Sequence, residues 1–578
     1  MSKKKSKKKW SKPSAGQAAS QSPEGLGKLG AQSQRESKKP WHERPIVRII
    51  KHYRTLILGI FTLVLFLGAV NPFFYFQGGD NAEYLMLARS LVHGQGFTST
   101  YTYPVQPHTK YPFFFPLMMA GMIWLFGENL VLIKIMIALC AAIMAGATYR
   151  MWEDQGDKGI ALGAALLVAT IPFTLQYSVR LLSEIPFAAW VCLTLLLAER
   201  ALKQDSVKSL PLVLGVFFAL AAYFTRSVGI VLLPALVGAA LLRSPVRSRL
   251  KQNLVMAAAI ALPFLAAFGA WFVRGYLLTH GQGKSYFREF FIKDSLDLSS
   301  PLIGFGDLIG RTQANGHYYL EQIGITLGPF ATAWGRNRQA GLGLLMVLIT
   351  LIGFFRVILR RRGAAELYAV AYSLLILIWS SSENRFLIPL YPLFLYYWLK
   401  GIEGLGLGIA RLFPALNRPA FFRSLLGVVS IIMLISNGWA DSQFLSTMAQ
   451  IRKMKGFEIN PRFQIIATNE ATSRILALAV YLRSHAEPDA VIFARKASLV
   501  ALASDHQAIG PPLASDPAGF IRDLETNRIR YILVDEMYRD VPEYMLPALK
   551  TYPERFQLVY QIPKTQSSLY RFLPEQKP

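Results

Sequence analysis

Long apolar runs dominate the chain between residues 55 and 440, and short polar connections separate them. The hydrocarbon core of a bilayer is about 30 Å thick, so a spanning helix needs about 20 mainly apolar residues. Eleven runs approach this length, and they predict a polytopic α-helical membrane protein. The predicted spans are 55–73, 129–149, 159–176, 186–202, 208–224, 227–243, 253–276, 341–359, 364–381, 386–401 and 423–440.

Basic residues are concentrated on alternate connections between these runs. One set of connections contains seventeen Lys and Arg residues, whereas the short connections of the other set contain only Arg180, Arg226 and Arg385. Short cytoplasmic loops collect Lys and Arg. We therefore predict a multi-pass protein of the cell (inner) membrane with an odd number of spans, a cytoplasmic N-terminus and a periplasmic or extracellular C-terminal domain.

Two external loops, near 72–128 and 277–340, are too long and too aromatic to be simple connectors. We expect both to lie on the membrane surface. In the first loop apolar residues, Tyr84 and Leu87 among them, recur at helical spacing beside polar residues, which indicates an interfacial amphipathic helix. The more apolar segment 113–126 indicates a second interfacial helix.

The composition becomes that of a soluble domain after residue 462. Helical and strand-like patterns alternate there, which predicts a small α/β domain with a mainly parallel sheet and a terminal hairpin. The expected helices are 471–484 and 517–526, and the expected strands are 490–493, 531–536 (buried and central), 556–562 and 568–573. The predicted organisation is a tail (1–54), a transmembrane domain (55–440), a linker (441–461) and an external domain (462–578).

The composition agrees with a membrane protein. Hydrophobic residues make up 53% of the 578 residues and charged residues only 17%, whereas soluble domains are about 25% charged. The net charge is +27, and the tail 1–54, expected to be disordered, contains 15 Lys and Arg against three Glu. Such a tail can bind nucleic acid or anionic lipid headgroups; beside a first span we favour membrane lipids and no nucleic acid. Cys140 and Cys192 lie in apolar runs, which excludes a disulfide framework and a Cys-based zinc site.

Ionisable residues at or beside a membrane are costly, so those on the external face are candidates for function. Asp80, in the sequence GGDNAEY, follows the first predicted span. One interpretation makes it a helix N-cap, with Glu83 completing a capping box. The other makes it a general base that takes a proton from a hydroxyl.

Four external cations form a second candidate group, because guanidinium and ammonium groups match phosphate oxygens. They are Lys110, Arg180, Arg226 and Arg385. Each also has a structural interpretation: Lys110 can extend its ammonium to lipid headgroups, and Arg180 can form a helical ion pair with Glu184 four residues later. As a set they predict an anion site at the external face.

The order of four stretches resembles a known superfamily. They are GGDNAEYLMLARSLVHGQGF, KYPFFFPLMMAGMIWLFGEN, YSVRLLSEIPF and ENRFLIPLYPLF. Their order and spacing are similar to those of the GT-C membrane glycosyltransferases, in particular the branch of protein O-mannosyltransferases and lipid A aminoarabinose transferases. That branch has an acidic residue after the first span in a D-x-x-x-Y setting, which Asp80 and Tyr84 match. The resemblance covers residues 50–440, and the external domain resembles one that many bacterial members append.

The resemblance implies a hexosyl- or pentosyltransferase with a polyprenyl-phosphate sugar as donor and a hydroxyl of a lipid, glycan or protein as acceptor. Asp80 would deprotonate the acceptor, which attacks the anomeric carbon with inversion, and Glu184 would be a second catalytic carboxylate. Glu83 and Tyr84 would position the substrate, and the four external cations would hold the donor phosphate. A divalent cation between Asp80 and Glu184 is left open, and no other cofactor is implied.

Two other functions fit the same residues. A transporter or flippase of lipid-linked sugars would use the arginines without a base, although many transporters contain internal repeats and none is visible here. A non-catalytic cell-envelope protein would simply display the external domain. Replacing Asp80 with Asn separates these functions, because only sugar transfer requires the base.

Overall fold

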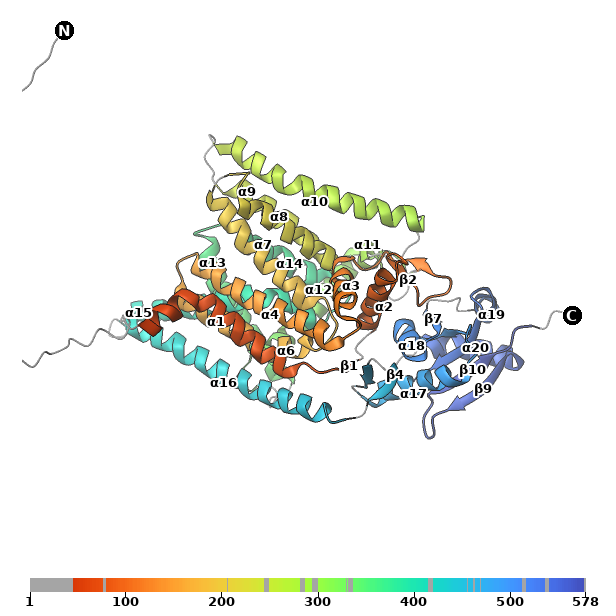
Figure 1. Cartoon of the computed structure of the whole chain (residues 1–578). Coiled ribbons are helices and arrows are strands. Elements are labelled where there is room, and N and C mark those ends of the chain that lie inside the picture. The colour runs from red at the N-terminus through yellow and green to blue at the C-terminus, as the bar shows by residue number, and fades with distance from the viewer. Residues whose placement is uncertain are drawn as a thin grey trace, which may run out of the picture. The chain divides into compact units, whose positions relative to one another are not determined.

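A computed structural model describes most of the chain from residue 45 onward (Figure 1). The described ranges are 45–75, 79–204, 206–243, 249–280, 286–293, 300–328, 330, 336–413, 419–454, 456–460, 463–467, 469–511, 516–535 and 540–575. The chain divides into two units, residues 1–52 and 53–578, and all contacts reported below lie within the second. Most of the predicted basic tail lies outside the described residues, but helix α1 begins at Pro45, inside the segment assigned to the tail.

The described part of the chain before residue 452 is mainly helical. Its α-helices are α1 (Pro45–Ala69), α2 (Asp80–Val92), α3 (Phe114–Phe126), α4 (Leu130–Glu153), α5 (Lys158–Ala169), α6 (Pro172–Ser178), α7 (Glu184–Gln204), α8 (Leu210–Thr225), α9 (Leu232–Leu242), α10 (Leu250–Thr279), α11 (Tyr286–Phe291), α12 (Phe305–Leu327), α13 (Arg336–Ile358), α14 (Ala364–Ile378), α15 (Tyr391–Leu412) and α16 (Pro419–Ile451). The 3₁₀ helices η2 (Ser227–Val231) and η5 (Asn384–Leu390) and the short strands β1 (Phe74–Tyr75), β2 (Thr98–Ser99) and β3 (Gln106–Pro107) lie between them.

Five helices in the described ranges are long and apolar enough to cross a membrane, namely α4, α7, α10, α13 and α16. Helices α5 and α6, bent by 49° at their junction, would form a sixth span if taken together. The other predicted spans coincide with shorter apolar helices or, at 386–401, with η5 and α15. The prediction of a multi-span helical membrane protein is therefore confirmed.

Helices also occupy both long loops. α2 and α3 lie at the positions of the two predicted interfacial helices, and Tyr84 and Leu87 are on the buried face of α2. The second loop contains α12, which the sequence reading did not predict because polar residues and glycines interrupt its apolar pattern. α12 packs against α13 and α14, and Asn315 donates hydrogen bonds to the carbonyls of Leu377 and Trp379 (both 2.9 Å).

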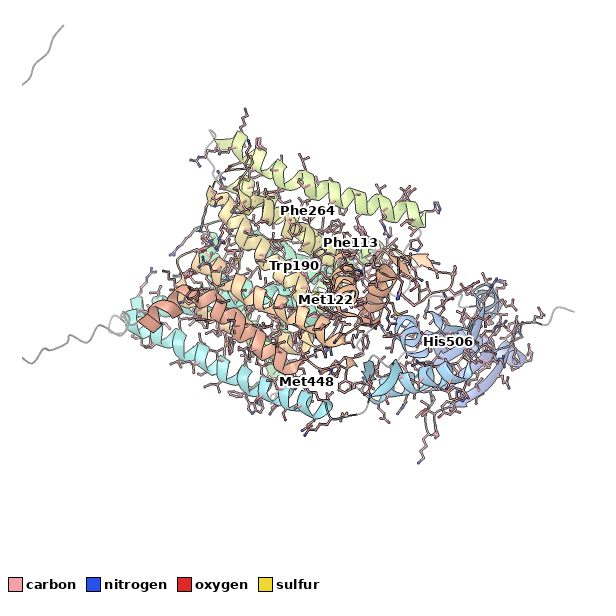
Figure 2. The ribbon with its side chains drawn as sticks, in the orientation of Figure 1. Phe113, Met122, Trp190, Phe264, Met448 and His506 are labelled. Carbon is pink, nitrogen blue, oxygen red and sulfur yellow. The ribbon has the colours of Figure 1, made fainter. Side chains whose placement is uncertain are left out.

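Side chains fill the space between these helices (Figure 2). Trp190 of α7 stacks on Phe218 of α8, with ring centroids 5.6 Å apart. Met448 of α16 lies beside the segment that follows α1, where its Sδ accepts the hydroxyl of Tyr75 (3.4 Å). The first contact joins consecutive helices and the second joins α16 to β1, and the buried side chains of the helices form one core cluster.

Glycines allow the backbones of α13 and α15 to approach each other directly where the two helices cross. An ideal Cβ on Gly353 would lie 1.8 Å from the carbonyl oxygen of Tyr397, and one on Gly401 would lie 1.9 Å from that of Ile349. Real Cβ atoms do not approach other atoms so closely, so this crossing requires glycine on both helices. Small residues serve this purpose in membranes, where helices associate through close packing.

We expect Gly401→Ala to lower the stability of the helical domain. The added methyl group must push α13 and α15 apart, and overpacking of this kind typically costs about 1–3 kcal/mol. Gly408→Ala is the matched control on α15, because an added Cβ there meets no atom within 4 Å. Thermal unfolding of the two variants in detergent measures the difference. Equal melting temperatures would contradict the close crossing.

The C-terminal part is a small α/β domain. Its five-stranded sheet has the order β7-β6-β8-β10-β9. Its elements are β6 (Val491–Phe493), β7 (Gln507–Ile509), β8 (Ile529–Val534), β9 (Phe556–Gln561), β10 (Ser568–Phe572), α17 (Glu470–His485), α18 (Ala497–Ser504), α19 (Pro517–Thr526), α20 (Asp540–Thr551) and η7 (Pro553–Arg555). β6, β7 and β8 are parallel, and β10 is antiparallel to β8 and β9.

The structure confirms a small α/β domain, with the central strand β8 and the terminal hairpin as predicted. The prediction of a mainly parallel sheet is wrong, because β10 pairs antiparallel with both β8 and β9 and makes the sheet mixed. Helix α19 has the predicted bounds, whereas α18, α20 and β7 were not predicted. A second sheet, in the order β1-β5-β4, is formed by β1 with β4 (Phe457–Asn460) and β5 (Phe463–Ile466). β1 lies between α1 and α2, so this sheet joins the C-terminal part to the membrane part. α16 continues to Ile451, through the first half of the segment predicted as a linker.

Candidate active site

Asp80 is the first residue of α2, and its side chain does not cap the helix. The N-cap is Gly79, whose φ of 96° lies in the left-handed region, and no side-chain cap hydrogen bond is present. The predicted capping box of Asp80 and Glu83 is therefore wrong. The Asp80 carboxylate instead accepts the hydroxyl of Tyr111 (2.9 Å) and pairs with Arg385 (2.9 Å). Its side chain is 27% exposed, so one side of the carboxylate reaches the surface of the site.

Arg385 connects two acidic residues from distant parts of the chain. One of its terminal nitrogens lies 2.9 Å from Asp80 and 3.2 Å from Glu184, and its Nε lies 2.6 Å from Glu383. Glu184, the first residue of α7, is only 2% exposed. η5 holds Arg385, so the 3₁₀ segment before α15 brings this guanidinium between α2 and α7.

Arg226 completes the cluster from the end of α8. Its guanidinium pairs with Glu184 and donates to the hydroxyl of Ser183 (3.1 Å). The same hydroxyl lies 3.1 Å from the hydroxyl of Tyr84 on α2. Glu184 Oε2 is buried without a hydrogen-bond partner among the described residues, so one oxygen of this carboxylate lacks a donor.

The electrostatic environment keeps Asp80 ionised. Burial raises the pKa of its carboxyl, but the charge and hydrogen bond of Arg385, the hydroxyl of Tyr111 and the charge of Lys110 outweigh burial. The pKa therefore lies below its ordinary value. At neutral pH the carboxylate can accept a proton.

The two other predicted cations surround this cluster. Lys110 pairs with Glu289 of α11 (2.9 Å), and Arg180 stacks on the ring of Tyr177, 4.5 Å from its centroid. The interpretation of Arg180 and Glu184 as a helical ion pair is wrong, because α6 ends at Ser178 and α7 begins at Glu184, so Arg180 lies in the connection between the two helices.

A second polar network supports the first. Glu83 accepts the hydroxyl of Tyr101 (2.6 Å). Burial and the charges of Lys110 and Arg274 lower the pKa of His108 to about 3, so this imidazole is neutral. His108 Nε2 accepts the backbone N–H of Tyr111 (2.8 Å), which places the proton on Nδ1, facing Ser99 Oγ (2.9 Å). His108 thereby fixes the residue that donates to Asp80.

The sequence reading missed Tyr111, Ser183 and Glu383. Tyr111 and Ser183 carry no charge at neutral pH and were invisible to a search for ionisable groups at the membrane. Glu383 is charged and lies two residues before Arg385, so their proximity in the sequence could have indicated that the two side chains pair.

The two carboxylates do not fit a divalent cation in this arrangement. The guanidinium of Arg385 lies between Asp80 and Glu184. Across the described ranges, no three His, Cys, Asp or Glu side chains come together as metal ligands.

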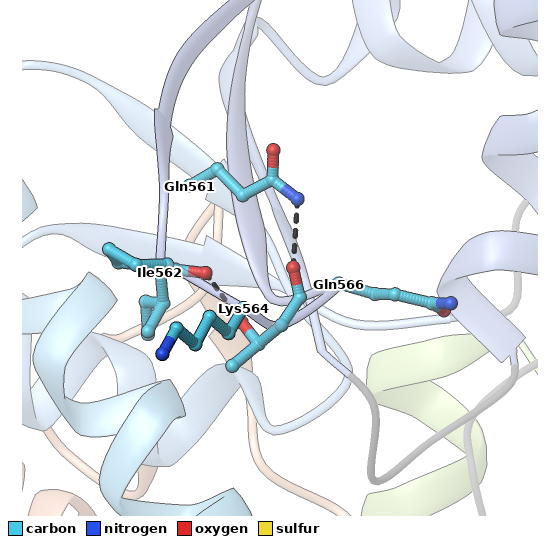
Figure 3. Close-up of a pocket in the computed structure, with 6 residues that line it drawn as sticks. Gln561, Ile562, Lys564 and Gln566 are labelled. Carbon is cyan, nitrogen blue, oxygen red and sulfur yellow. Dashed lines mark hydrogen bonds between the residues drawn. The ribbon is translucent and has the colours of Figure 1, made fainter.

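A separate hollow lies at the turn between β9 and β10 (Figure 3). Its walls are residues 561–566, and Gln561 and Thr565 are hydrogen-bonded to each other across the turn (2.8 Å). It is an open depression with no acid and base side by side. The cluster around Asp80 is therefore the candidate active site.

Residues 110–271 match the sequence profile of the dolichyl-phosphate-mannose-protein mannosyltransferase family. The match supports the predicted resemblance of this chain to the GT-C membrane glycosyltransferases. The matched segment includes Lys110, Glu184 and Arg226 of the candidate site. No curated protein matches the sequence.

Solved structures with a similar fold agree with this match. The apo oligosaccharyltransferase of Archaeoglobus fulgidus is 12% identical with a TM-score of 0.55, over 91% of this chain and 75% of its own. Apo ArnT from Cupriavidus metallidurans is 12% identical with a TM-score of 0.51, over 90% of this chain and 98% of its own. At this identity the structures establish the fold alone. Together with the family match they confirm the predicted resemblance to polyprenyl-phosphate-sugar glycosyltransferases.

Proposed function

We propose that this membrane glycosyltransferase moves a sugar from a polyprenyl-phosphate donor to a hydroxyl of a lipid, glycan or protein at the outer face. The observation that carries the proposal is the ionised Asp80 carboxylate paired with Arg385, which also contacts Glu184, the partner of Arg226. Two related structures support the ligand classes: ArnT was solved bound to undecaprenyl phosphate, and the A. fulgidus enzyme AglB with an inhibitory peptide and a dolichol-phosphate.

The arrangement supports an inverting displacement with Asp80 as general base. The acceptor hydroxyl gives its proton to the Asp80 carboxylate, and its oxygen forms a bond to the anomeric carbon. The bond from that carbon to the phosphate oxygen breaks, and the phosphate leaves with the electron pair. A phosphate is a weak base and needs no proton to leave, so positive charge on its oxygens is the stabilisation it requires.

Arg385 and Arg226 are the principal phosphate ligands in this proposal. Both guanidinium groups are largely removed from water and meet at Glu184, and buried charge-assisted hydrogen bonds are stronger than those in solvent. Lys110 and Arg180 add positive charge at the edge of the site. The free buried oxygen of Glu184 would accept a sugar hydroxyl, while Glu83 and Tyr84 position the substrate through Tyr101 and Ser183.

We place the N-terminus in the cytoplasm and the C-terminal domain outside it, with eleven spans. The asymmetry of Lys and Arg between the two sets of connections supports this orientation. The same proposal includes the predicted domain boundaries after residues 54, 440 and 461. The donor phosphate would then approach from the outer leaflet.

Deleting the chain from its host should test the function. We expect a polyprenyl-phosphate sugar to accumulate and one glycan, lipid or protein to lose that sugar. Mass spectrometry of lipid extracts and envelope fractions measures both changes, and the wild-type gene should reverse them. A transporter predicts a different result: purified protein in vesicles would move the lipid-linked sugar between leaflets without transferring it. If the donor did not accumulate and no glycan, lipid or protein lost the sugar, the proposal would be contradicted.

A further inference from the structure

The C-terminal domain contacts the start of the helix that carries Asp80. α18 packs on α2, and all its residues from Ser498 to Ser504 are buried (Figure 1). The hydroxyl of Ser498 donates to the backbone carbonyl of Gly79 (3.1 Å). The C-terminal domain therefore reaches within one residue of the proposed base.

This hydrogen bond acts directly on the backbone of Asp80. The carbonyl of Gly79 also accepts the N–H of Glu83 in the first turn of α2 (3.1 Å). A peptide group is planar, so fixing the Gly79 carbonyl fixes the nitrogen and Cα of the next residue. Gly79 itself has a left-handed backbone conformation, which other residues rarely adopt. The hydrogen bond from Ser498 thus holds Gly79 in a backbone conformation that glycine adopts readily.

The same domain holds the loop that supports Glu83. The N–H of Ala508 on β7 donates to the carbonyl of Tyr101 (2.7 Å), and the Gln507 side chain donates to the carbonyl of Thr102 (3.1 Å). Tyr101 in turn donates to Glu83. Gln507 and Ala508 directly follow His506, which is labelled in the C-terminal domain in Figure 2.

A third contact precedes Asp80 in the chain. β1 pairs in parallel with β5, with Phe74 opposite Ile465 and Tyr75 opposite Ile466. Asn81 donates to the carbonyl of Tyr75. The domain is therefore bonded to the backbone before Asp80, at Gly79 and in the loop beyond α2.

We infer that the C-terminal domain is a positioning element for the catalytic carboxylate, and that Ser498 is its positioning residue. The inference rests on the proposed function of Asp80. Three contacts hold the chain around Asp80, at Gly79, in β1 and in the loop that supports Glu83, and the Asp80 carboxylate lies within hydrogen-bond distance of Tyr111 and Arg385. The domain acts on the reaction without touching the substrate.

The test compares Ser498→Ala with Ser504→Ala in the full-length enzyme. Both serines are buried on α18, but the Ser504 hydroxyl donates to the carbonyl of Val500 within that helix and accepts the N–H of His506 (3.3 Å), and neither partner belongs to α2 or its loop. Loss of one neutral hydrogen bond corresponds to about a 2- to 10-fold change. We expect kcat to fall by that factor in Ser498→Ala only, with an unchanged KM for the donor and a melting temperature equal to that of Ser504→Ala. Ser498→Thr, which keeps the hydroxyl, should restore kcat.

Two further readouts distinguish positioning from general destabilisation. In Ser498→Ala the acidic limb of the pH profile should move to higher pH. A weaker contact with Arg385 lowers the pKa of Asp80 less, while burial still raises it, so the pKa increases. In an Asp80→Asn background, Ser498→Ala should have no further effect. Equal kcat values for Ser498→Ala and Ser504→Ala, or additive losses with Asp80→Asn, would overturn the inference while leaving the proposed function intact. Full transfer by Asp80→Asn alone would instead overturn the proposed function.

Discussion

Replacing Asp80 with Asn is expected to lower sugar transfer by about 10²- to 10⁴-fold, the usual contribution of a general base. An amide keeps the size of the carboxylate, and its oxygen can accept from Tyr111 or Arg385, but it cannot take the acceptor proton. α2 should still form, because Gly79 and not the Asp80 side chain occupies the N-cap. Single-turnover transfer by purified variant, with the donor that accumulates on deletion, measures the loss.

Asp154→Asn is the matched control for this prediction. Asp154 follows the last residue of α4 and pairs with Arg200 (2.6 Å) and, at a longer distance, with Arg150 (4.0 Å), so the variant also loses a carboxylate and its ion pairs. It lies outside the candidate site and should transfer sugar at the wild-type rate. If Asp80→Asn matched that rate, the base would have to be sought at Glu184 or Glu83. If substitutions at Glu184 and Glu83 also left the rate unchanged, the proposal of sugar transfer would be dropped in favour of transport.

Arg385→Gln is expected to lower transfer by about 10- to 100-fold, because a charge-assisted contact is worth about 1.5–3 kcal/mol. Donor binding should weaken as well, since the guanidinium meets the phosphate before and during reaction. The pH profile should also change. Arg385 is the main group that lowers the pKa of Asp80 against burial, so its removal raises that pKa. The base is then protonated over a wider range, and the acidic limb of the rate moves to higher pH.

Arg361→Gln controls for the loss of a partly buried ion pair. Arg361 pairs with the fully buried Glu366 of α14 (2.8 Å) and belongs to a different cluster, beside Trp152. Its replacement should lower the melting temperature without moving the pH profile of the folded enzyme. Unchanged donor affinity and an unchanged acidic limb in Arg385→Gln would remove this arginine from the site.

Patterns within short stretches of sequence were sufficient for the local elements. Apolar runs located the helices of the membrane part, and the switch to strand-like alternation located β6, β8, β9 and β10. Helix α19 has the predicted bounds, and its start is fixed by near neighbours: Pro517 occupies its first position, and the Asp516 side chain caps the helix. These features depend on neighbours along the chain, so the sequence contains them directly.

The sequence also determined which ionisable residues to consider, since few stand at the external face of a membrane protein. It did not determine their partners. Asp80 and Arg385 are 305 residues apart, and only the tertiary structure brings the start of α2 beside η5. The N-cap role of Asp80 and the helical pair of Arg180 with Glu184 failed for this reason: each assumed that the nearest residue in sequence is the nearest in space.

The tertiary structure alone decided what supports the site. Neither the sequence of α18 nor that of β7 indicates that the C-terminal domain bonds to the backbone around Asp80. Those contacts are hydrogen bonds to the carbonyls of Gly79, Tyr101 and Thr102. Every residue has a backbone carbonyl, so its chemistry carries no sequence signature, and only the folded arrangement determines which carbonyls the domain reaches.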